Sequence, residues 1–435
     1  MAHSLSSALP VPQGGSKKPP VLILDGGMGT TLQAPPFNLA LDSALWSSEL
    51  LASQEGRQQL VNLHKTWIEA GADIVQTCTY QSTLPLFLPP PSNSNSTPPS
   101  QETISSALST MTSALPVAAS ACSPSSSSSQ KRARVALSLG PYGSSLQPGQ
   151  EYTGAYPPPF GPRETAAPEA KPGCDPTALE ACPLPLEEVG ASYRVNIANQ
   201  EEEVHLAAWH LQRLQHLSTS ANWNEGEVDL LAFETVPSLT EIRAIRKAMH
   251  IFTRTHFPSN NGAAKAFYIS LVFPRTSDSD AAVRFPDPEL AHLPTLADQV
   301  PLLVRAALAP QEEEGYALPG GLGFNCTSPL HARQVVRLLS NEVATLSSTD
   351  TEGGEKKPWL LVYPDGGAVY DVKTRTWHHP TGLTDKSWAK LVADSVAEAV
   401  DGSVWAGVVL GGCCKAGPGA IKALREEVEQ RGWRR

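Results

Sequence analysis

Short apolar runs recur along the chain, and each is followed by glycine, proline or polar residues and then by a helical pattern. The runs are rich in β-branched residues and mostly continuous, which is typical of strands that are buried on both faces of a parallel sheet. Eight segments fit this description: 21–24, 72–76, 134–139, 228–233, 266–273, 320–324, 359–362 and 405–410.

Apolar residues at helical spacing fill most of the intervals between these runs, as Leu60, Leu63 and Trp67 do within 58–70. The other helical segments are 189–214, 239–250, 296–307, 330–339, 385–399 and 419–430. Alternating strands and helices indicate βα units, and eight such units indicate a closed barrel. An open doubly wound sheet is the alternative, but its GxGxxG signature is missing, because 25–30 reads DGGMGT. The sequence therefore predicts an α/β fold, a single (β/α)8 TIM barrel.

Two long stretches interrupt this pattern after the second and third predicted strands. Residues 88–131 are rich in Ser and Pro, and we expect a largely disordered, low-complexity insertion with room for a helix at 103–114. Residues 142–186 read as a Pro/Gly-rich loop. The polar tail at 1–19 is expected to be disordered, so that the barrel occupies residues 20–432.

Length and charge narrow the range of functions. The chain has 435 residues and a formal net charge of −10, and one barrel with insertions accommodates this length. An acidic chain without a basic stripe is a poor candidate for binding nucleic acid or an anionic membrane. Transmembrane and signal segments are not predicted, because a sufficiently long apolar run is missing. The sequence thus predicts a cytoplasmic protein, and no feature specifies an oligomeric state.

Cysteine positions provide the first candidate chemistry. The chain has seven cysteines, and an odd number in a long chain without a secretion signal argues against a disulfide framework. Cys326 directly follows the sixth predicted strand, and Cys413 and Cys414 follow the eighth, so all three fall at the carboxyl-terminal face where barrels build active sites. Three thiolates on zinc leave one position open for a substrate. A buried cysteine is more often a small apolar residue, and the spacing alone leaves both readings open.

Two carboxylates fall at the same face of the predicted barrel. Asp25 follows the first predicted strand and Glu234 follows the fourth. Such a pair could act as general acid and base, could hold a substrate ammonium group, or could cap the helices that follow.

Nine motifs, taken together, resemble the homocysteine S-methyltransferases. This family includes the S-methylmethionine- and betaine-dependent enzymes and the homocysteine-binding module of cobalamin-dependent methionine synthase. The motifs are LDGGMGTTL at 24–32, LWSSELL at 45–51, AGADIVQTCTYQST at 70–83, SLGPYG at 138–143, EYTGAY at 151–156, DLLAFETVPSLTE at 229–241, GFNCTSP at 323–329, VYPDGGAVYD at 362–371 and GGCCKAGP at 411–418. The combination of GFNC and GGCC is the most specific of these signals.

The resemblance implies a zinc-dependent transfer of a methyl group to homocysteine, forming methionine. It places Zn²⁺ on Cys326, Cys413 and Cys414, with the homocysteine sulfur as fourth ligand. It also assigns further residues to homocysteine: Asp25 and Glu234 to the amino group, the amides of Gly27 and Met28 to the carboxylate, and Asn325 to the shape of the pocket.

The methyl donor is expected on the other side of the metal, where the resemblance places Trp46 and Tyr80. Aromatic rings can hold a cationic donor, although Trp46 could instead only pack the start of a helix. TCTYQ at 77–81 resembles the branch that uses S-methylmethionine, with S-adenosylmethionine as a second expected donor. Cys78 and Lys415 depart from the usual family pattern. The alternatives are betaine or another donor, a selenol acceptor, or an inactive zinc-binding regulatory protein.

Overall fold

The computed structural model describes most of the chain. The described residues are 5–9, 18–89, 99–123, 132–147, 149–161, 169–170, 200–221, 223, 226–256, 265–275, 282–310, 315–349, 357–371, 376–378 and 381–433.

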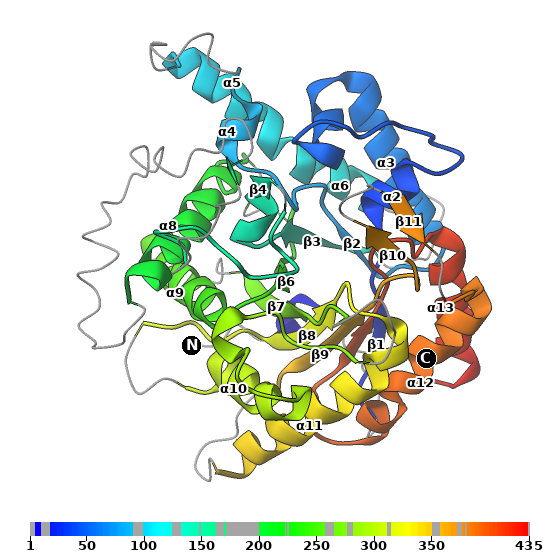
Figure 1. The fold of residues 1–435 in the computed structure, drawn as a ribbon. Coiled ribbons are helices and arrows are strands. Elements are labelled where there is room, and N and C mark those ends of the chain that lie inside the picture. The colour runs from blue at the N-terminus through cyan, green and yellow to red at the C-terminus, as the bar shows by residue number, and fades with distance from the viewer. Residues whose placement is uncertain are drawn as a thin grey trace.

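Eight parallel strands form one sheet in the order β1-β12-β9-β8-β7-β6-β3-β2. Their bounds are β1 Val21–Ile23, β2 Ile74–Gln76, β3 Arg134–Leu139, β6 Leu230–Val236, β7 Ala266–Val272, β8 Gly321–Asn325, β9 Trp359–Tyr363 and β12 Val408–Leu410. The two end strands approach each other through a parallel bridge between Leu24 and Ile74. The ring of strands in Figure 1 is therefore the predicted barrel.

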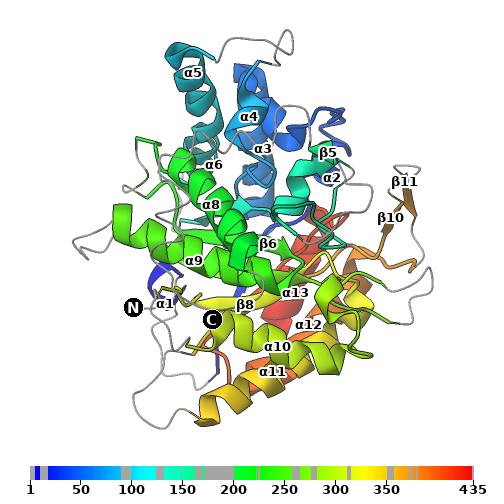
Figure 2. The same ribbon diagram turned by 60° about the vertical axis from the view of Figure 1, so that its left-hand side comes forward.

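One helix follows each strand and covers the outside of the ring, as Figures 1 and 2 show. These helices are α3 Gln54–Glu69, α6 Ala114–Cys122, α8 Gln200–Leu217, α9 Leu239–His256, α10 Leu296–Leu308, α11 Ala332–Thr349, α12 Asp385–Asp401 and α13 Pro418–Gln430. Consecutive helices pack on one another, most extensively α8 on α9 and α12 on α13. This arrangement confirms the predicted fold class.

Burial on both faces explains why the strands read as continuous apolar runs. Within the strands, Leu22, Leu230 and Leu361 belong to a cluster inside the ring, whereas Val21, Leu231 and Leu360 belong to the layer beneath the helices. Alternate residues of one strand thus serve two separate apolar layers, so that neither face is polar.

The predicted disordered insertion at 88–131 differs from the structure between residues 99 and 123. This stretch forms α5 (Gln101–Thr112) and then α6, which is the barrel helix between β2 and β3. Met111, Leu115 and Ala118 are fully buried and lie at helical spacing. The helix expected at 103–114 is thus present as α5, whereas the serine-rich composition hid α6. Figure 2 shows α5 extending beyond the ring of strands.

The predicted loop at 142–186 and the predicted helix at 189–214 lie partly outside the described residues. Residues 142–161 of the loop predicted at 142–186 are described, apart from residue 148, and they begin with the turn η2 (Tyr142–Ser145). Tyr142, Tyr156 and Phe160 in this part are buried. A two-residue strand, β5 (Glu169–Ala170), pairs with β4 (Leu146–Gln147). The predicted helix at 189–214 is described only from residue 200 onward.

The amino-terminal tail, predicted to be disordered, contains the short helix α1 (Leu5–Ala8). Leu5 and Leu9 are buried and belong to the cluster inside the ring. The Trp359 Nε1–H donates to Ser6 Oγ at 3.0 Å. Because Trp359 is the first residue of β9, α1 closes the amino-terminal end of the barrel, opposite the face that carries the cysteines.

Substitution of Leu5 by alanine is expected to lower the free energy of unfolding by about 2–3 kcal/mol, because a fully buried leucine side chain leaves a cavity. Urea denaturation measures this change. Leu302→Ala is the matched control, since Leu302 is 40% exposed on α10, and its effect should stay within about 0.5 kcal/mol. Equal effects of the two substitutions would show that α1 does not pack into the barrel end.

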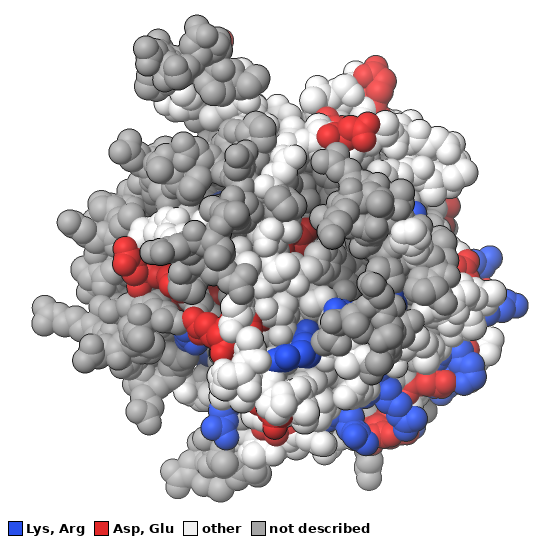
Figure 3. Space-filling view, viewed as in Figure 1, with Lys and Arg blue, Asp and Glu red and all other residues white. Residues whose placement is uncertain are grey.

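The outer helices carry charges of both signs. Figure 3 shows basic and acidic side chains interleaved on one face of the molecule. On α12 and α13, Arg431 pairs with Asp394 and Glu427, and Arg425 pairs with Glu429. Such exposed pairs contribute little stability individually. Among the described residues, no helix combines the length and apolar character that crossing a bilayer would need.

Candidate active site and metal centre

Three cysteines meet at the carboxyl-terminal end of the barrel. Cys326 follows β8 directly, and Cys413 and Cys414 follow β12 after two glycines. Only β9 separates β8 from β12 in the sheet. The three sulfur atoms consequently lie within 4.8 Å of one another, and all three residues are half-buried. Cys326 and Cys413 are joined as a disulfide, whereas Cys414 is a free thiol.

Backbone hydrogen bonds join the three loops that carry or flank this cluster. The Cys413 N–H donates to Pro364 O at 2.8 Å, and the Gly366 N–H donates to Cys414 O at 2.8 Å. The Asp365 N–H donates to Thr327 O at 3.1 Å, which brings in the loop after β8. The loop after β9 therefore holds the other two loops, and with them the sulfur positions, in place.

Left-handed backbone is concentrated around the cluster. Trp46, Thr235, Cys326 and Lys415 have φ values of 49°, 57°, 46° and 65°. This region of φ is costly for residues with a Cβ and is found mostly where surrounding structure enforces it. The surrounding structure therefore fixes the backbone at these four positions in a conformation that is unfavourable for residues with a Cβ.

The donor set suits a soft divalent metal. Three sulfurs around tetrahedral zinc would be about 3.8 Å apart, given Zn–S distances of about 2.3 Å. The three sulfurs lie within 4.8 Å of one another, so Cys326 and Cys413 would reach that spacing once the bond between them is reduced and their sulfurs move apart. Burial and the Asp365 and Glu151 carboxylates raise the pKa of the Cys414 thiol to about 12. The neighbouring Lys415 lowers this pKa by less than burial raises it, so the thiol stays protonated at neutral pH, and a bound metal would supply further positive charge.

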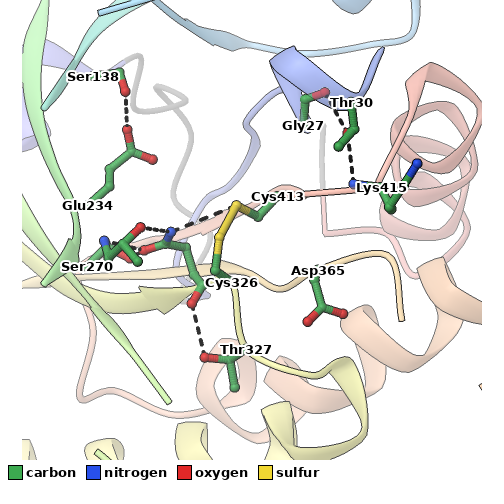
Figure 4. Close-up of a disulfide and its surroundings, with 12 residues drawn as sticks. Gly27, Thr30, Ser138, Glu234, Ser270, Cys326, Thr327, Asp365, Cys413 and Lys415 are labelled. Carbon is green, nitrogen blue, oxygen red and sulfur yellow. Dashed lines mark hydrogen bonds between the residues drawn. A yellow bond between two sulfur atoms is a disulfide. The ribbon is translucent and has the colours of Figure 1, made fainter. Parts of the chain in front are cut away.

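Asn325 links the cysteine cluster to the wall of the barrel. It is 1% exposed, and its Oδ1 accepts from the Thr235 N–H and from Ser270 Oγ, both at 2.8 Å. Its Nδ2 donates to Thr235 Oγ1 at 2.7 Å and points to Cys413 Sγ at 3.9 Å. Figure 4 shows these hydrogen bonds around the two bonded sulfurs. A fixed amide next to a sulfur can orient that ligand and tune it.

Asp25 and Glu234 are both buried inside the barrel near the cluster. Asp25 Oδ2 accepts from the Gln76 N–H at 2.8 Å, and Glu234 Oε1 accepts from Ser138 Oγ at 2.6 Å. Among the described residues Asp25 Oδ1 has no hydrogen-bond partner. Neither carboxylate caps a helix, because their partners lie on strands, so the helix-cap alternative is wrong.

Burial raises the pKa of both carboxyls. For Asp25 the rise is large, and the neighbouring Glu234 charge adds to it. For Glu234, hydrogen bonds from Ser138, Gln76 and Tyr363 oppose the effect of burial on the pKa. Two buried carboxylates that repel one another, one with an unpaired oxygen, form a site that a cation would stabilise.

The two predicted amides differ in availability. The Gly27 N–H already donates to Ala416 O at 3.0 Å, so the structure gives it a partner other than a substrate. Met28 is the first residue of α2 (Met28–Leu32), and first-turn N–H groups have no acceptor within their own helix. Of the pair, Met28 is therefore the better donor to a ligand carboxylate.

Trp46 and Tyr80 each pack on a glycine. A Cβ added at Gly29 would lie 2.0 Å from the Trp46 ring, and one added at Gly140 would lie 2.9 Å from the Tyr80 ring. Trp46 starts the turn η1 (Trp46–Ala52) after β1, and Tyr80 follows β2. Both residues are half-buried, and Trp46 also packs against the apolar core.

Several polar residues of this face were not predicted from the sequence. Ser138 and Gln76 hold the two carboxylates, and Thr235 pairs with Asn325. Glu241, fully buried on α9, accepts from the Tyr142 N–H at 2.7 Å and from the Tyr156 hydroxyl at 2.6 Å. All four are polar positions on otherwise apolar strands or, for Glu241, on the buried side of α9, which is the signal that could have found them.

Known proteins are similar to this chain over nearly its whole length. The family model for homocysteine S-methyltransferase matches residues 22–428. The homocysteine S-methyltransferase of Escherichia coli (strain K12) is 27% identical over 411 residues, covering 94% of this chain and 95% of that protein. Homocysteine S-methyltransferase 2 of Zea mays is 25% identical over 414 residues, covering 94% and 90%.

A selenocysteine Se-methyltransferase and a solved structure are also similar to this chain. The selenocysteine Se-methyltransferase of Brassica oleracea var. italica is 24% identical over 412 residues, covering 94% of this chain and 89% of that protein. The oxidized form of the homocysteine methyltransferase MmuM from Escherichia coli superposes with a TM-score of 0.52 at 20% identity, covering 94% and 96% of the two chains. The family match over this length, on a barrel with a metal-binding cysteine cluster, shows that the chain belongs to the homocysteine S-methyltransferase family of enzymes.

Proposed function

We propose that this enzyme transfers a methyl group from S-methylmethionine to homocysteine at a zinc ion held by Cys326, Cys413 and Cys414. The observation that carries the proposal is the cluster of three half-buried cysteines at the same end of the barrel as two buried carboxylates. Three protein ligands leave one tetrahedral position for the acceptor thiol. S-adenosylmethionine is proposed as a second donor.

The ammonium group and the carboxylate of homocysteine would each have a binding partner in the protein. Asp25 and Glu234 would bind the ammonium group, which fits the unpaired oxygen of Asp25, and the Met28 amide, with that of Gly27 as its neighbour, would face the carboxylate. Asn325 would hold the Cys413 sulfur in a fixed orientation. A free thiol with a pKa of about 8.5 is only a few per cent thiolate at neutral pH, and zinc coordination supplies a fully deprotonated thiol.

The donor would approach from the side of Trp46 and Tyr80, whose rings can bind a sulfonium cation. The homocysteine sulfur forms a bond to the methyl carbon, and the bond from that carbon to the sulfonium sulfur breaks. The electron pair returns to the donor sulfur, which becomes a neutral thioether. Both S-methylmethionine and homocysteine thus end as methionine, and the thiol proton leaves to solvent when the acceptor binds.

Methionine formation from homocysteine with S-methylmethionine, S-adenosylmethionine and betaine in parallel tests the proposal. We expect the highest kcat/KM with S-methylmethionine. Preference for betaine would reassign the donor. Metal-loaded protein without turnover on any of the three donors would favour a regulatory role and contradict the proposed activity.

A selenol is the second candidate acceptor, and the similarity to a selenocysteine Se-methyltransferase favours it. A selenol is more acidic than a thiol and would need less activation by the metal. Competition between homocysteine and selenocysteine for one donor decides between them. A higher kcat/KM for selenocysteine would make the thiol the minor acceptor.

Reduction is expected to control metal loading. The disulfide between Cys326 and Cys413 takes up two of the three proposed ligands, and cysteine binds zinc as a thiolate and not as a disulfide. Protein oxidised and stripped of metal should regain about one zinc per chain after treatment with a phosphine reductant, and far less without it. Atomic absorption measures the stoichiometry. Equal uptake with and without the reductant would show that these two cysteines are not ligands.

A further inference from the structure

Arg213 is a buried cation next to the proposed donor side, and neither the sequence motifs nor the proposed function gives it a role. It lies on α8 and is 3% exposed. Its guanidinium donates to four backbone carbonyls: Nε to Ser82 at 2.8 Å, Nη1 to Gly140 at 2.8 Å, and Nη2 to Thr79 and to Tyr80, both at 2.6 Å.

The four carbonyls belong to two different loops. Thr79, Tyr80 and Ser82 lie in the loop after β2, and Gly140 follows β3. The Gly140 N–H also donates to Tyr80 O at 3.0 Å. Since the Tyr80 ring rests against Gly140, Arg213 holds both the backbone of Tyr80 and the surface on which its ring lies.

A chain of side-chain contacts runs from the loop of Tyr80 to the cysteine cluster. Thr79 Oγ1 donates to Ser138 O at 2.7 Å, and Ser138 Oγ donates to Glu234 Oε1 at 2.6 Å, next to Thr235. Thr235 Oγ1 accepts from Asn325 Nδ2 at 2.7 Å, and the same Nδ2 points to Cys413 Sγ. The loop that Arg213 holds is therefore tied to the cluster, and Tyr80 lies on it at the end of the barrel that carries the cysteines.

We propose that Arg213 is a positioning residue for the methyl donor: it fixes the loop at 79–82 so that the Tyr80 ring faces the open side of the cysteine cluster. The inference rests on the proposed function, because it gives Tyr80 a donor to hold. Arginine suits the task, since its planar group carries five N–H donors in a fixed fork, whereas lysine has a single ammonium that cannot span both loops.

Arg246 provides a matched control at the other end of the barrel. It is fully buried on α9, and its guanidinium likewise donates to backbone carbonyls, those of Ala306, Ala309 and Ala317. These carbonyls lie at the end of α10 and before β8, at the amino-terminal side of the barrel. Arg213→Lys and Arg246→Lys therefore remove the same kind of clamp, one beside the site and one remote from it.

Steady-state kinetics with S-methylmethionine and homocysteine test the proposal. Arg213→Lys should raise the KM for the donor by on the order of 10–100-fold, because a displacement of about 1 Å has effects of this size. The KM for homocysteine and the zinc content should stay within about twofold of the wild type. Arg246→Lys should change the melting temperature and leave both KM values unchanged.

Gly140→Ala provides a second variant that leaves Arg213 in place. The added methyl group would lie 2.6 Å from Tyr80 O and 2.9 Å from the Tyr80 ring, so it should also raise the donor KM. Because both substitutions act on the same contact, the double variant should show less than the product of the two effects. Hydrogen exchange of the peptide that covers 77–83 should rise in Arg213→Lys and not in Arg246→Lys.

The outcomes separate this inference from the proposed function. An active wild type together with an unchanged donor KM in Arg213→Lys would overturn the role of Arg213 and leave the function intact. A rise of both KM values, or loss of zinc, would show general disruption and would also overturn it. A wild type that is inactive with every donor would overturn the proposed function itself.

Discussion

Replacing Cys326 with alanine is expected to remove the bound metal and to abolish methyl transfer. The two remaining thiolates are one fewer than the three protein ligands that a catalytic zinc site needs. Zinc content should fall from about one per chain to below about 0.1, and kcat/KM should fall by on the order of 10³-fold or more, since activation and orientation of the thiol are both lost. Atomic absorption and methionine formation measure the two effects.

Comparing Cys326→Gly with Cys326→Ala separates the loss of metal from the loss of stability, because the backbone at Cys326 is left-handed. Its φ of 46° favours glycine, and an L-residue in this region costs roughly 1 kcal/mol. Cys326→Gly should therefore lose the metal as completely as Cys326→Ala and yet unfold at a higher temperature when both are metal-free. A structural cysteine without a metal would show no such combination.

Cys122→Ala is the control for cysteine removal. Cys122 is 3% exposed on α6 and packs in the layer between the helices and the strands. Its loss should cost about 1 kcal/mol of stability and leave zinc content and kcat/KM unchanged. Full zinc content and full activity in Cys326→Ala would show that Cys326 is not a metal ligand and would contradict the proposed metal centre.

The barrel could be predicted because each strand serves two apolar layers. That requirement leaves continuous runs such as 359–362, and the helices between them show the helical period clearly. Within the low-complexity insertion, the helix expected at 103–114 is present as α5, and the prediction missed only α6. Most of α6 is buried, but it is a short run of small residues between stretches rich in serine, so its composition resembles that of a disordered segment.

The candidate site could be predicted because barrel topology converts sequence position into spatial position. Residues at the carboxyl ends of parallel strands share one face, which brings Cys326 to Cys413 and Asp25 to Glu234. Glu234 was expected after the fourth strand and in fact lies within β6, which continues to Val236. Hydrogen-bond partners are different, since they depend on rotamers and on loop paths. The sequence could not indicate that Gly27 already donates to Ala416.

The hydrogen-bond partners of Arg213 could not be predicted from the sequence either. It lies on the apolar stripe of α8 with Leu206 and Leu217, where a charge is unusual. A buried guanidinium must find acceptors, but its acceptors are carbonyls of residues more than 70 positions away in the sequence. Periodicity could flag the residue, whereas only the folded chain identifies the loops that it holds.

Substitution of Asp25 by asparagine is expected to weaken homocysteine binding while the metal stays bound. Loss of one partner of a buried, hydrogen-bonded charge pair commonly costs about 2–5 kcal/mol, so the KM for homocysteine should rise by on the order of 100-fold or more. In the D25N protein the amide oxygen of the new side chain can still accept from the Gln76 N–H, and the fold should persist. Zinc content and the donor KM should stay near the wild-type values.

The same substitution should stabilise the metal-free, substrate-free protein. Burial and Glu234 raise the pKa of Asp25, so the folded protein binds this proton more tightly than the unfolded chain does. Between the ordinary carboxyl value of about 3.9 and the raised one, stability therefore falls as pH rises. Asp25→Asn removes that loss. Its melting temperature should exceed that of the wild type at neutral pH, and the difference should shrink as pH falls toward about 4.

Asp73→Asn is the matched control, because Asp73 makes the equivalent contact at the opposite end of the barrel. Asp73 Oδ2 accepts from the Ile23 N–H at 2.9 Å, as Asp25 Oδ2 accepts from Gln76. Asp73 precedes β2, far from the cysteines, so Asp73→Asn should leave the KM for homocysteine unchanged. An unchanged homocysteine KM in Asp25→Asn, or an equal rise in both variants, would mean that Asp25 supports the barrel and does not bind the substrate ammonium group.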